Sequence, residues 1–364
     1  MRYPNTLLAC LTALALLSPG ARAETPNLPA ASNHGLDAMA PHGRWAARLT
    51  LLRNSYDQRY DDARERVDLD AGYDGLDLAT IGLAGQLNLD TDVVTEYAEL
   101  MLGYGVTPDL TVGAIIPYAR TTRHARFSVD GGIGTAGLQA VLTGALGYKP
   151  LGTSTTSGLG DPTLGALWRF HKSARDSAVL GLGVRFGVAD PDDPDDLMDV
   201  PPGDGSTDLR ARIEYFRDLG RGFDLRLLAE YQPQFADTVV MRPGNPLTTA
   251  TKERLERDLG DYWEFDVELG KSFGDWRVAG TWHRYQEGPD RYTSSLGTDT
   301  SFLSANTDTL ADQLRLSLTW SGIRAWLAGR LPMPLIVKLE VQDAVAGRNF
   351  VDVRDVYLRV TSFF

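Results

Sequence analysis

The sequence predicts an all-β protein: a transmembrane antiparallel β-barrel of about 12 strands, preceded by a cleaved signal peptide. Three observations carry this prediction. They are an apolar run at the start of the chain, a hydrophobic period of two residues through the remainder, and connections that alternate between short and long. With 43% apolar and 23% charged residues, the chain of 364 residues has the composition of a folded protein, which excludes wholesale disorder.

Residues 1–23 have the layout of an export signal. Arg2 supplies a basic start, residues 7–17 are apolar, and Ala21-Arg22-Ala23 ends in a small-x-small cleavage pattern. Cleavage after Ala23 removes Cys10, the single cysteine of the chain, and this excludes a disulfide scaffold or a cysteine-rich metal site. We expect residues 24–43 to form a periplasmic lead or a short plug, and residues 44–364 to form the barrel.

Apolar and polar residues alternate in runs of about 10–14 residues, longer than the strands of about 5–6 residues that soluble proteins use and long enough to cross a membrane. In residues 207–217, for example, Leu209 and Ile213 alternate with Arg210 and Arg212. The predicted strands are 44–54, 93–104, 110–122, 160–170, 178–188, 207–217, 223–235, 260–272, 275–286, 308–320, 334–344 and 351–364.

The connections between these runs predict which end of the barrel faces outward. Five are turns, of which the one at 321–333 is the longest, and they alternate with six loops that are mostly long, which is the asymmetry of outer-membrane barrels. This arrangement gives an even number of strands with both chain ends in the periplasm. The loop at 123–159 either constricts the lumen or adds a hairpin that raises the count to 14 strands.

Two segments resemble a known family. Residues 97–118 form a hairpin that turns at Thr107-Pro108-Asp109, and the Gly158-Leu159-Gly160-Asp161 segment opens the next strand. Together they resemble the outer-membrane transporters named for the meta pathway of phenol degradation, which are distantly like the long-chain fatty-acid transporters. The resemblance covers residues 93–235, and it implies passage of small molecules, among them hydrophobic or aromatic compounds.

The inward-facing positions of the strands supply candidate site residues. Arginines on neighbouring strands face an acidic run on a later strand, which predicts a transverse electric field that orients solutes, ion pairs that fill the lumen, or both. The lumen-lining candidates are Arg169, Arg185, Arg210, Arg212, Arg226, Glu264, Asp266, Glu268 and His283. No cofactor is required, and no metal site is assigned. In the loop at 189–206, weak calcium candidates are Asp190, Asp192, Asp193, Asp195 and Asp196.

The predicted function is a channel or transporter in the outer membrane of a Gram-negative-type bacterium, for passive passage of small molecules, and not an enzyme. The alternatives are a barrel-embedded lipid hydrolase using His171 and Ser173 or His283, and a soluble or structural β protein without transport. Expected partners are outer-membrane lipids and lipopolysaccharide, a small solute, and the barrel assembly machinery, which would recognise the last strand ending in Phe364. A net charge of −12 excludes general attraction to nucleic acid. The pattern identifies neither the solute nor the oligomeric state.

Overall fold

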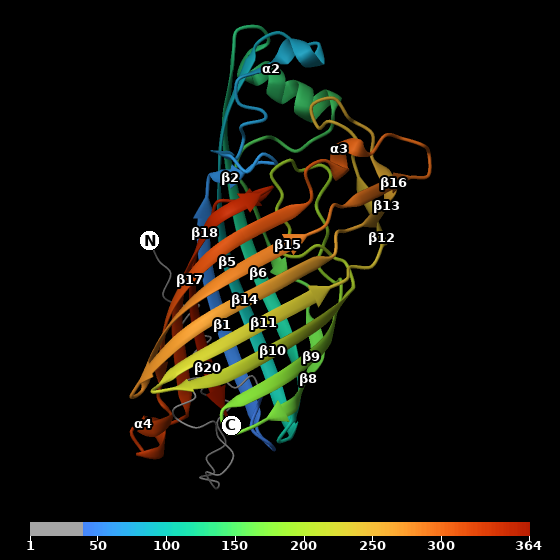
Figure 1. Ribbon diagram of the computed structural model, residues 1–364. Helices are drawn as coiled ribbons and strands as arrows, with labels where there is room; N and C mark the ends of the chain where they lie inside the picture. Colours follow the sequence, from blue (N-terminus) through green and yellow to red (C-terminus); the bar gives the residue numbers. More distant parts are fainter. Residues whose placement is uncertain (1–38) are drawn as a thin grey trace.

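The computed structural model describes residues 39–364, in which twelve strands close into one antiparallel barrel (Figure 1). The predicted signal peptide and residues 24–38 of the predicted lead lie outside the described residues. The barrel strands are β1 (Trp45–Tyr56), β5 (Gln86–Thr107), β6 (Leu110–Asp130), β8 (Thr163–Lys172), β9 (Asp176–Arg185), β10 (Asp208–Gly220), β11 (Phe223–Gln232), β14 (Tyr262–Phe273), β15 (Trp276–Glu287), β17 (Thr309–Ser321), β18 (Leu335–Arg348) and β20 (Arg354–Phe363).

Each barrel strand pairs with the barrel strands before and after it in the chain, and β1 closes the ring by pairing with both β5 and β20. Each of the twelve predicted runs overlaps one of these strands, so the predicted architecture is confirmed. Two short strands, β4 (Leu76–Asp77) and β7 (Ser154–Leu159), add to β5 and β6 outside the ring. The barrel therefore has 12 strands, and β7 does not raise the count to 14.

The outer face of the barrel is an apolar belt. Large side chains that face away from the lumen are well exposed, for example Leu316 (64%), Leu269 (53%) and Leu182 (57%). Exposure on this scale is unfavourable in water and is expected where lipid covers the wall. Near strand ends the belt has exposed tryptophans, among them Trp45 and Trp263, as expected for interfacial girdles. None of the helices in residues 39–364 is long and apolar enough to span a membrane.

The two ends of the barrel differ. At the turn end, strands are joined by short turns such as Gly274-Asp275, and the longest of these connections contains the helix α4 (Ile323–Leu327). At the loop end, β5 and β6 extend beyond their predicted ends by pairing residues 86–92 with 124–130. Apolar and polar residues still alternate there: Leu87 and Val129 are buried, while polar side chains pair across the strands, as Arg126 does with Asp90 (2.8 Å) and Asp92 (3.0 Å).

The outer loops form a cap with its own hydrophobic core. Its helical parts are η2 (Leu78–Ile81), α2 (Gly134–Ala140) and the π-helical η3 (Val141–Ala145), and Figure 1 shows α2 above the barrel. Leu78, Leu138 and Leu142 are almost fully buried in this core. Smaller elements complete the cap: β12 (Asp237–Met241), β13 (Glu253–Asp258), β16 (Arg291–Ser294), β2 (Gln58–Tyr60), β3 (Arg66–Asp68), β19 (Phe350–Val351) and α3 (Ser301–Ser304).

The Gly158-Leu159-Gly160-Asp161 segment anchors one of these loops. The buried carboxylate of Asp161 accepts hydrogen bonds from the backbone N–H groups of Val188 and Ala189 (both 2.8 Å) and of Asp204 and Gly205 (both 3.1 Å). One side chain thus holds both ends of the loop between β9 and β10 against the mouth of the barrel. Satisfying four backbone donors with one carboxylate is a strong local restraint.

Candidate functional site: the barrel lumen

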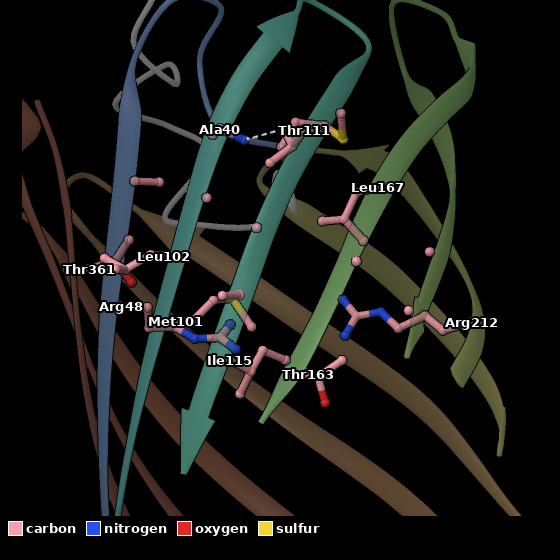
Figure 2. Close-up of a pocket in the computed structure, with 18 of the residues that line it drawn as sticks. Ala40, Arg48, Met101, Leu102, Thr111, Ile115, Thr163, Leu167, Arg212 and Thr361 are labelled. Carbon is pink, nitrogen blue, oxygen red and sulfur yellow. Dashed lines mark hydrogen bonds between the residues drawn. The ribbon is translucent and has the colours of Figure 1, made fainter. Parts of the chain in front are cut away.

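A cavity of about 260 Å³ lies inside the barrel toward its turn end (Figure 2). Strand residues from most of the ring line it, together with Met39 and Ala40 from the segment before β1. Residues 131–153 of the loop that we expected to constrict the lumen do not contribute to this lining. They pack in the cap instead, where their apolar side chains are buried.

Residues 39–43 enter the barrel at the turn end, with Met39 and Ala40 lining the cavity. The N–H of Ala40 donates to Thr111 Oγ1 (3.0 Å), and the N–H of Gly43 donates to the carbonyl of Gly105 (2.8 Å). Met39 and Ala40 are both buried. A Cβ on Gly105 would lie 2.2 Å from the carbonyl oxygen of Pro41, so this close approach requires glycine. Met39 and Ala40 of the predicted lead are therefore held within the barrel, and residues 41–43 contact its turn end.

The inner face from β10 to β18 carries ion pairs. Arg210 pairs with Glu230, and Glu214 pairs with both Arg212 and Arg226. Further round the ring, Asp266 contacts His283 (2.7 Å) and Arg315 (3.3 Å). Glu268 contacts Arg277 (2.6 Å) and Lys338 (3.8 Å). These arginines and carboxylates therefore pair with each other within a strand or across the inner face, rather than forming separate basic and acidic walls.

The predicted candidates divide between the cavity and other parts of the lumen. Arg210, Arg212 and Arg226 line the cavity. Arg169 lies at the turn end, where its Nε donates to Asp109 of the β5–β6 turn (2.9 Å). Arg185 lies at the loop end among Asp204, Asp208 and Asp161. Glu264, Asp266, Glu268 and His283 lie on the neighbouring strands β14 and β15 and do not line the cavity.

Several cavity residues were not among the candidates. Arg48, Lys338 and Arg359 line the cavity from β1, β18 and β20. The alternation along each strand predicts that all three side chains face the lumen, because each lies between two apolar residues that face the other way. The order of strands around a closed ring, which brings β20 beside β1, is what places all three near Arg210 and Arg226.

The cavity surface is more basic than its residue pairs suggest. Six basic side chains line it, against two acidic ones; they are Arg48, Arg210, Arg212, Arg226, Lys338 and Arg359, against Glu214 and Glu230. The carboxylates are also recessed: the side chain of Arg210 is 27% exposed and its partner Glu230 is 3% exposed, while Arg359 is 26% exposed and Glu340 is 2% exposed. A chain with a net charge of −12 thus presents a positive inner surface here.

The residues considered for lipid hydrolysis have other contacts. His171 Nε2 lies 2.6 Å from Asp176 Oδ1, and the hydroxyl of Ser173 donates to the same oxygen (2.7 Å). The Ser173 oxygen also accepts the backbone N–H of Asp176 (3.0 Å), as in a tight turn. A hydroxyl that donates to a carboxylate is not activated by the imidazole as nucleophilic catalysis requires. His283 pairs with Asp266 inside the barrel wall.

The acidic loop between β9 and β10 contacts basic residues of neighbouring loops. Asp193 pairs with Lys149 (2.8 Å), and Asp195 pairs with Arg242 and Lys252 (2.6 Å each). Within residues 39–364, no group of three or more His, Cys, Asp or Glu side chains is arranged to hold a metal ion. Calcium binding by Asp190, Asp192, Asp193, Asp195 and Asp196 stays a prediction.

Burial and neighbouring charges shift the pKa values of carboxyl groups in this loop. It raises the pKa of Asp192 to about 7, and the nearby carboxylates of Asp199, Asp193 and Asp196 add to the shift. Hydrogen bonding to Lys149 lowers the pKa of Asp193 instead. The loop therefore contains one carboxyl group that titrates near neutral pH beside others that stay ionised.

Comparison with known proteins places the chain. No curated protein matches it. Its fold is similar to that of an outer membrane channel from Pseudomonas putida F1, with 13% identity and a TM-score of 0.57 over 96% of this chain and 100% of that one. A FadL homologue from Pseudomonas aeruginosa matches with 13% identity and a TM-score of 0.39, covering 93% of this chain and 94% of that one. A mutant of TodX, a monoaromatic hydrocarbon channel, matches with 9% identity and a TM-score of 0.42, covering 89% of this chain and 91% of that one.

A family model shows which family the chain belongs to, in addition to its fold. The model described as the MetA-pathway of phenol degradation matches residues 80–310, more than half of the chain. The match spans the two segments on which the resemblance was based. With the closed 12-strand ring and its apolar belt, it identifies an outer-membrane β-barrel, and the chain belongs to the family of the MetA-pathway of phenol degradation.

Proposed function

We propose that this barrel is a passive channel in the outer membrane for small molecules, including hydrophobic or aromatic compounds. One observation carries the proposal: inside the ring lies a cavity whose lining at the turn end includes Met39 and Ala40, from the short segment before β1. A segment that is not part of the strand ring can move aside without disturbing the barrel. Passage of this kind needs no cofactor and no catalytic group. The monoaromatic hydrocarbon channels among the fold neighbours make aromatic solutes the first to test.

Planar-bilayer conductance and liposome swelling test the channel. Residues 24–364 are refolded in detergent and compared with a chain that begins at Arg44, and a mobility shift on unheated gels checks that both have folded. We expect measurable conductance for the longer chain and a several-fold higher value for the shorter one. No conductance and no swelling with either folded chain would overturn the proposal.

A lipid hydrolase remains the second candidate, since His171 and Ser173 are two residues apart and a carboxylate lies beside them. We expect the pure protein to release no fatty acid from phospholipid vesicles. Hydrolysis that is lost in Ser173→Ala and kept in Ser177→Ala would favour the enzyme over the channel.

The remaining assignments concern location and assembly. We propose that cleavage after Ala23 yields a chain with a periplasmic segment at residues 24–43 and a barrel at residues 44–364. The barrel assembly machinery is proposed to recognise β20, which closes the ring on β1. Lipopolysaccharide is proposed to contact the acidic outer loops through divalent cations. Mass measurement of the N-terminus after export tests the first of these assignments.

A further inference from the structure

Four glycines form a continuous row across the inner face of the barrel. Gly103 of β5 lies opposite Gly113 of β6, which lies opposite Gly165 of β8, which lies opposite Gly183 of β9. All four line the cavity. Because neighbouring strands lie about 4.8 Å apart, the row leaves about 14 Å of wall without inner side chains. The result is a flat trough of bare backbone.

Apolar side chains border this trough. Met101 of β5 and Ile115 of β6 lie opposite each other, two residues from the glycine row toward the loop end. Leu167 of β8 lies two residues from the row toward the turn end. Figure 2 shows Met101, Ile115 and Leu167 around the same space. A planar apolar group could lie flat on the glycine backbone and contact these side chains along its edges.

Guanidinium groups stand at both ends of the trough. On the β10 side, Arg210 lies opposite Gly183 and Arg212 lies opposite Gly181. On the other side, Arg48 of β1 lies opposite Met101. Figure 2 shows Arg48 and Arg212 extending toward the cavity from opposite sides. Arg48 has a loose pair with Glu99 (3.7 Å), and Arg212 shares Glu214 with Arg226. A guanidinium has five N–H donors, so each has donors left for a further anion.

We propose that the cavity binds aromatic carboxylates: organic anions whose flat ring lies on the glycine row and whose carboxylate is held by Arg212 or Arg48. This inference rests on the proposed channel function and narrows it to a substrate class. A neutral hydrocarbon would use the trough but leave the surplus of basic side chains unused. A small inorganic anion would use the arginines but not the trough. A planar anion uses both, and arginine binds carboxylates in bidentate geometry.

Isothermal titration of the folded protein in detergent tests the inference without requiring an open pore. The probes are sodium benzoate, benzyl alcohol, which has the ring without the charge, and sodium acetate, which has the charge without the ring. We expect benzoate to bind about tenfold or more tightly than either, because benzyl alcohol lacks the charge-assisted hydrogen bond to arginine and acetate lacks the ring that lies on the glycine row. Equal affinity for benzoate and benzyl alcohol would overturn the inference.

Single substitutions test whether benzoate binds at the trough. Arg212→Gln and Arg48→Gln should each weaken benzoate about tenfold and leave benzyl alcohol unchanged. Both should fold, since Glu214 keeps Arg226 and Glu99 keeps the hydroxyl of Tyr97 (3.2 Å). Gly103→Ala should weaken benzoate and benzyl alcohol alike, because its Cβ would enter the trough with only the Thr111 methyl closer than 3.4 Å. Arg120→Gln, in an exposed pair with Glu96, is the matched control.

The outcomes separate this inference from the channel function. Benzoate binding that depends on Arg212 or Arg48, with no conductance and no liposome swelling, would uphold the site and refute the channel. Passage of benzyl alcohol with no benzoate preference in titration would uphold the channel and overturn the inference. Benzoate binding that survives both arginine substitutions would also overturn it.

Discussion

The wall formed by β10 to β18 and the wall formed by β5 to β9 have similar apolar outer faces, but their inner faces differ in chemistry. Outside, both present apolar side chains such as Leu269 and Leu182. Inside, the first wall is filled by ion pairs such as that of Arg277 with Asp224, and the second is bare backbone at the glycine row. Lipid contacts only every second residue of a strand, so it constrains only those residues. The other residues are free to make one wall rigid and the other a surface for ligands.

The largest expected effect comes from breaking the charged wall. Arg277 is 2% exposed and contacts Asp224 and Glu268 (2.6 Å), so Arg277→Ala leaves the buried Asp224 without its cation and Glu268 with only Lys338 at 3.8 Å. We expect a loss of about 3–5 kcal/mol in the free energy of unfolding, measured by urea titration of the refolded protein in vesicles. Arg120→Ala breaks a 3.9 Å pair between exposed side chains and should change little. Equal midpoints for the two variants would contradict a structural role for the charged wall.

The second effect concerns the bare wall and the segment that covers it. In Gly105→Ala the new Cβ would collide with the carbonyl of Pro41, so residues 39–43 must leave the turn end of the lumen. We expect single-channel conductance to rise several-fold while the barrel keeps its mobility shift on unheated gels. Gly144→Ala, which meets no atom within 4 Å, is the control. Unchanged conductance in a folded Gly105→Ala variant would mean that residues 39–43 do not limit passage.

The smallest effect concerns the loop that joins the two walls between β9 and β10. Because the pKa of Asp192 is raised to about 7 from its ordinary 3.8, the protonated form stabilises the loop fully below about pH 4. That stabilisation is lost as the pH rises to 7. Lys149 lowers the pKa of Asp193, which stays ionised across this range.

Limited proteolysis measures this change. We expect cleavage between residues 186 and 207 to become several-fold faster, relative to an unfolded substrate, between pH 5 and pH 8. Asp192→Asn should remove the dependence, and Asp190→Asn should keep it. A pH dependence shared by all three proteins would assign it to another group.

Much of the barrel could be predicted from the sequence because lipid enforces alternation along every strand. Leu209 and Ile213 on one face, with Arg210 and Arg212 on the other, identify a strand and its orientation without further information. The extensions of β5 and β6 carry the same alternation, since Phe127 and Val129 alternate with Arg126, although the predicted strands stop short of them. Alternation does not tell lipid from protein as the partner of the apolar face: here that face packs in the core of the cap, and the polar face carries pairs such as Arg126 with Asp90.

The site was harder to predict than the fold, because the alternation along a strand shows which way a side chain faces but not which side chains lie next to it. Arg212 and Arg226 face inward by pattern, but their shared partner Glu214 depends on the register of β10 against β11. The glycine row is also a property of register: Gly103 and Gly183 are 80 positions apart and align only when four strands are paired. The approach of Pro41 to Gly105 has no periodic signal at all, because it comes from an irregular segment.

The glycine row has a consequence for how this barrel acquires its pairing during membrane insertion. Strands with few inner side chains specify register weakly, because sliding them by two residues changes few contacts on that face. Correct pairing of β5, β6, β8 and β9 then depends on contacts elsewhere, such as the pair of Arg169 with Asp109 at the turn end and the four hydrogen bonds of Asp161 at the loop end. Conservative-looking changes at the membrane interface of these strands should therefore yield mispaired, protease-sensitive chains more often than the same changes in β14 or β15.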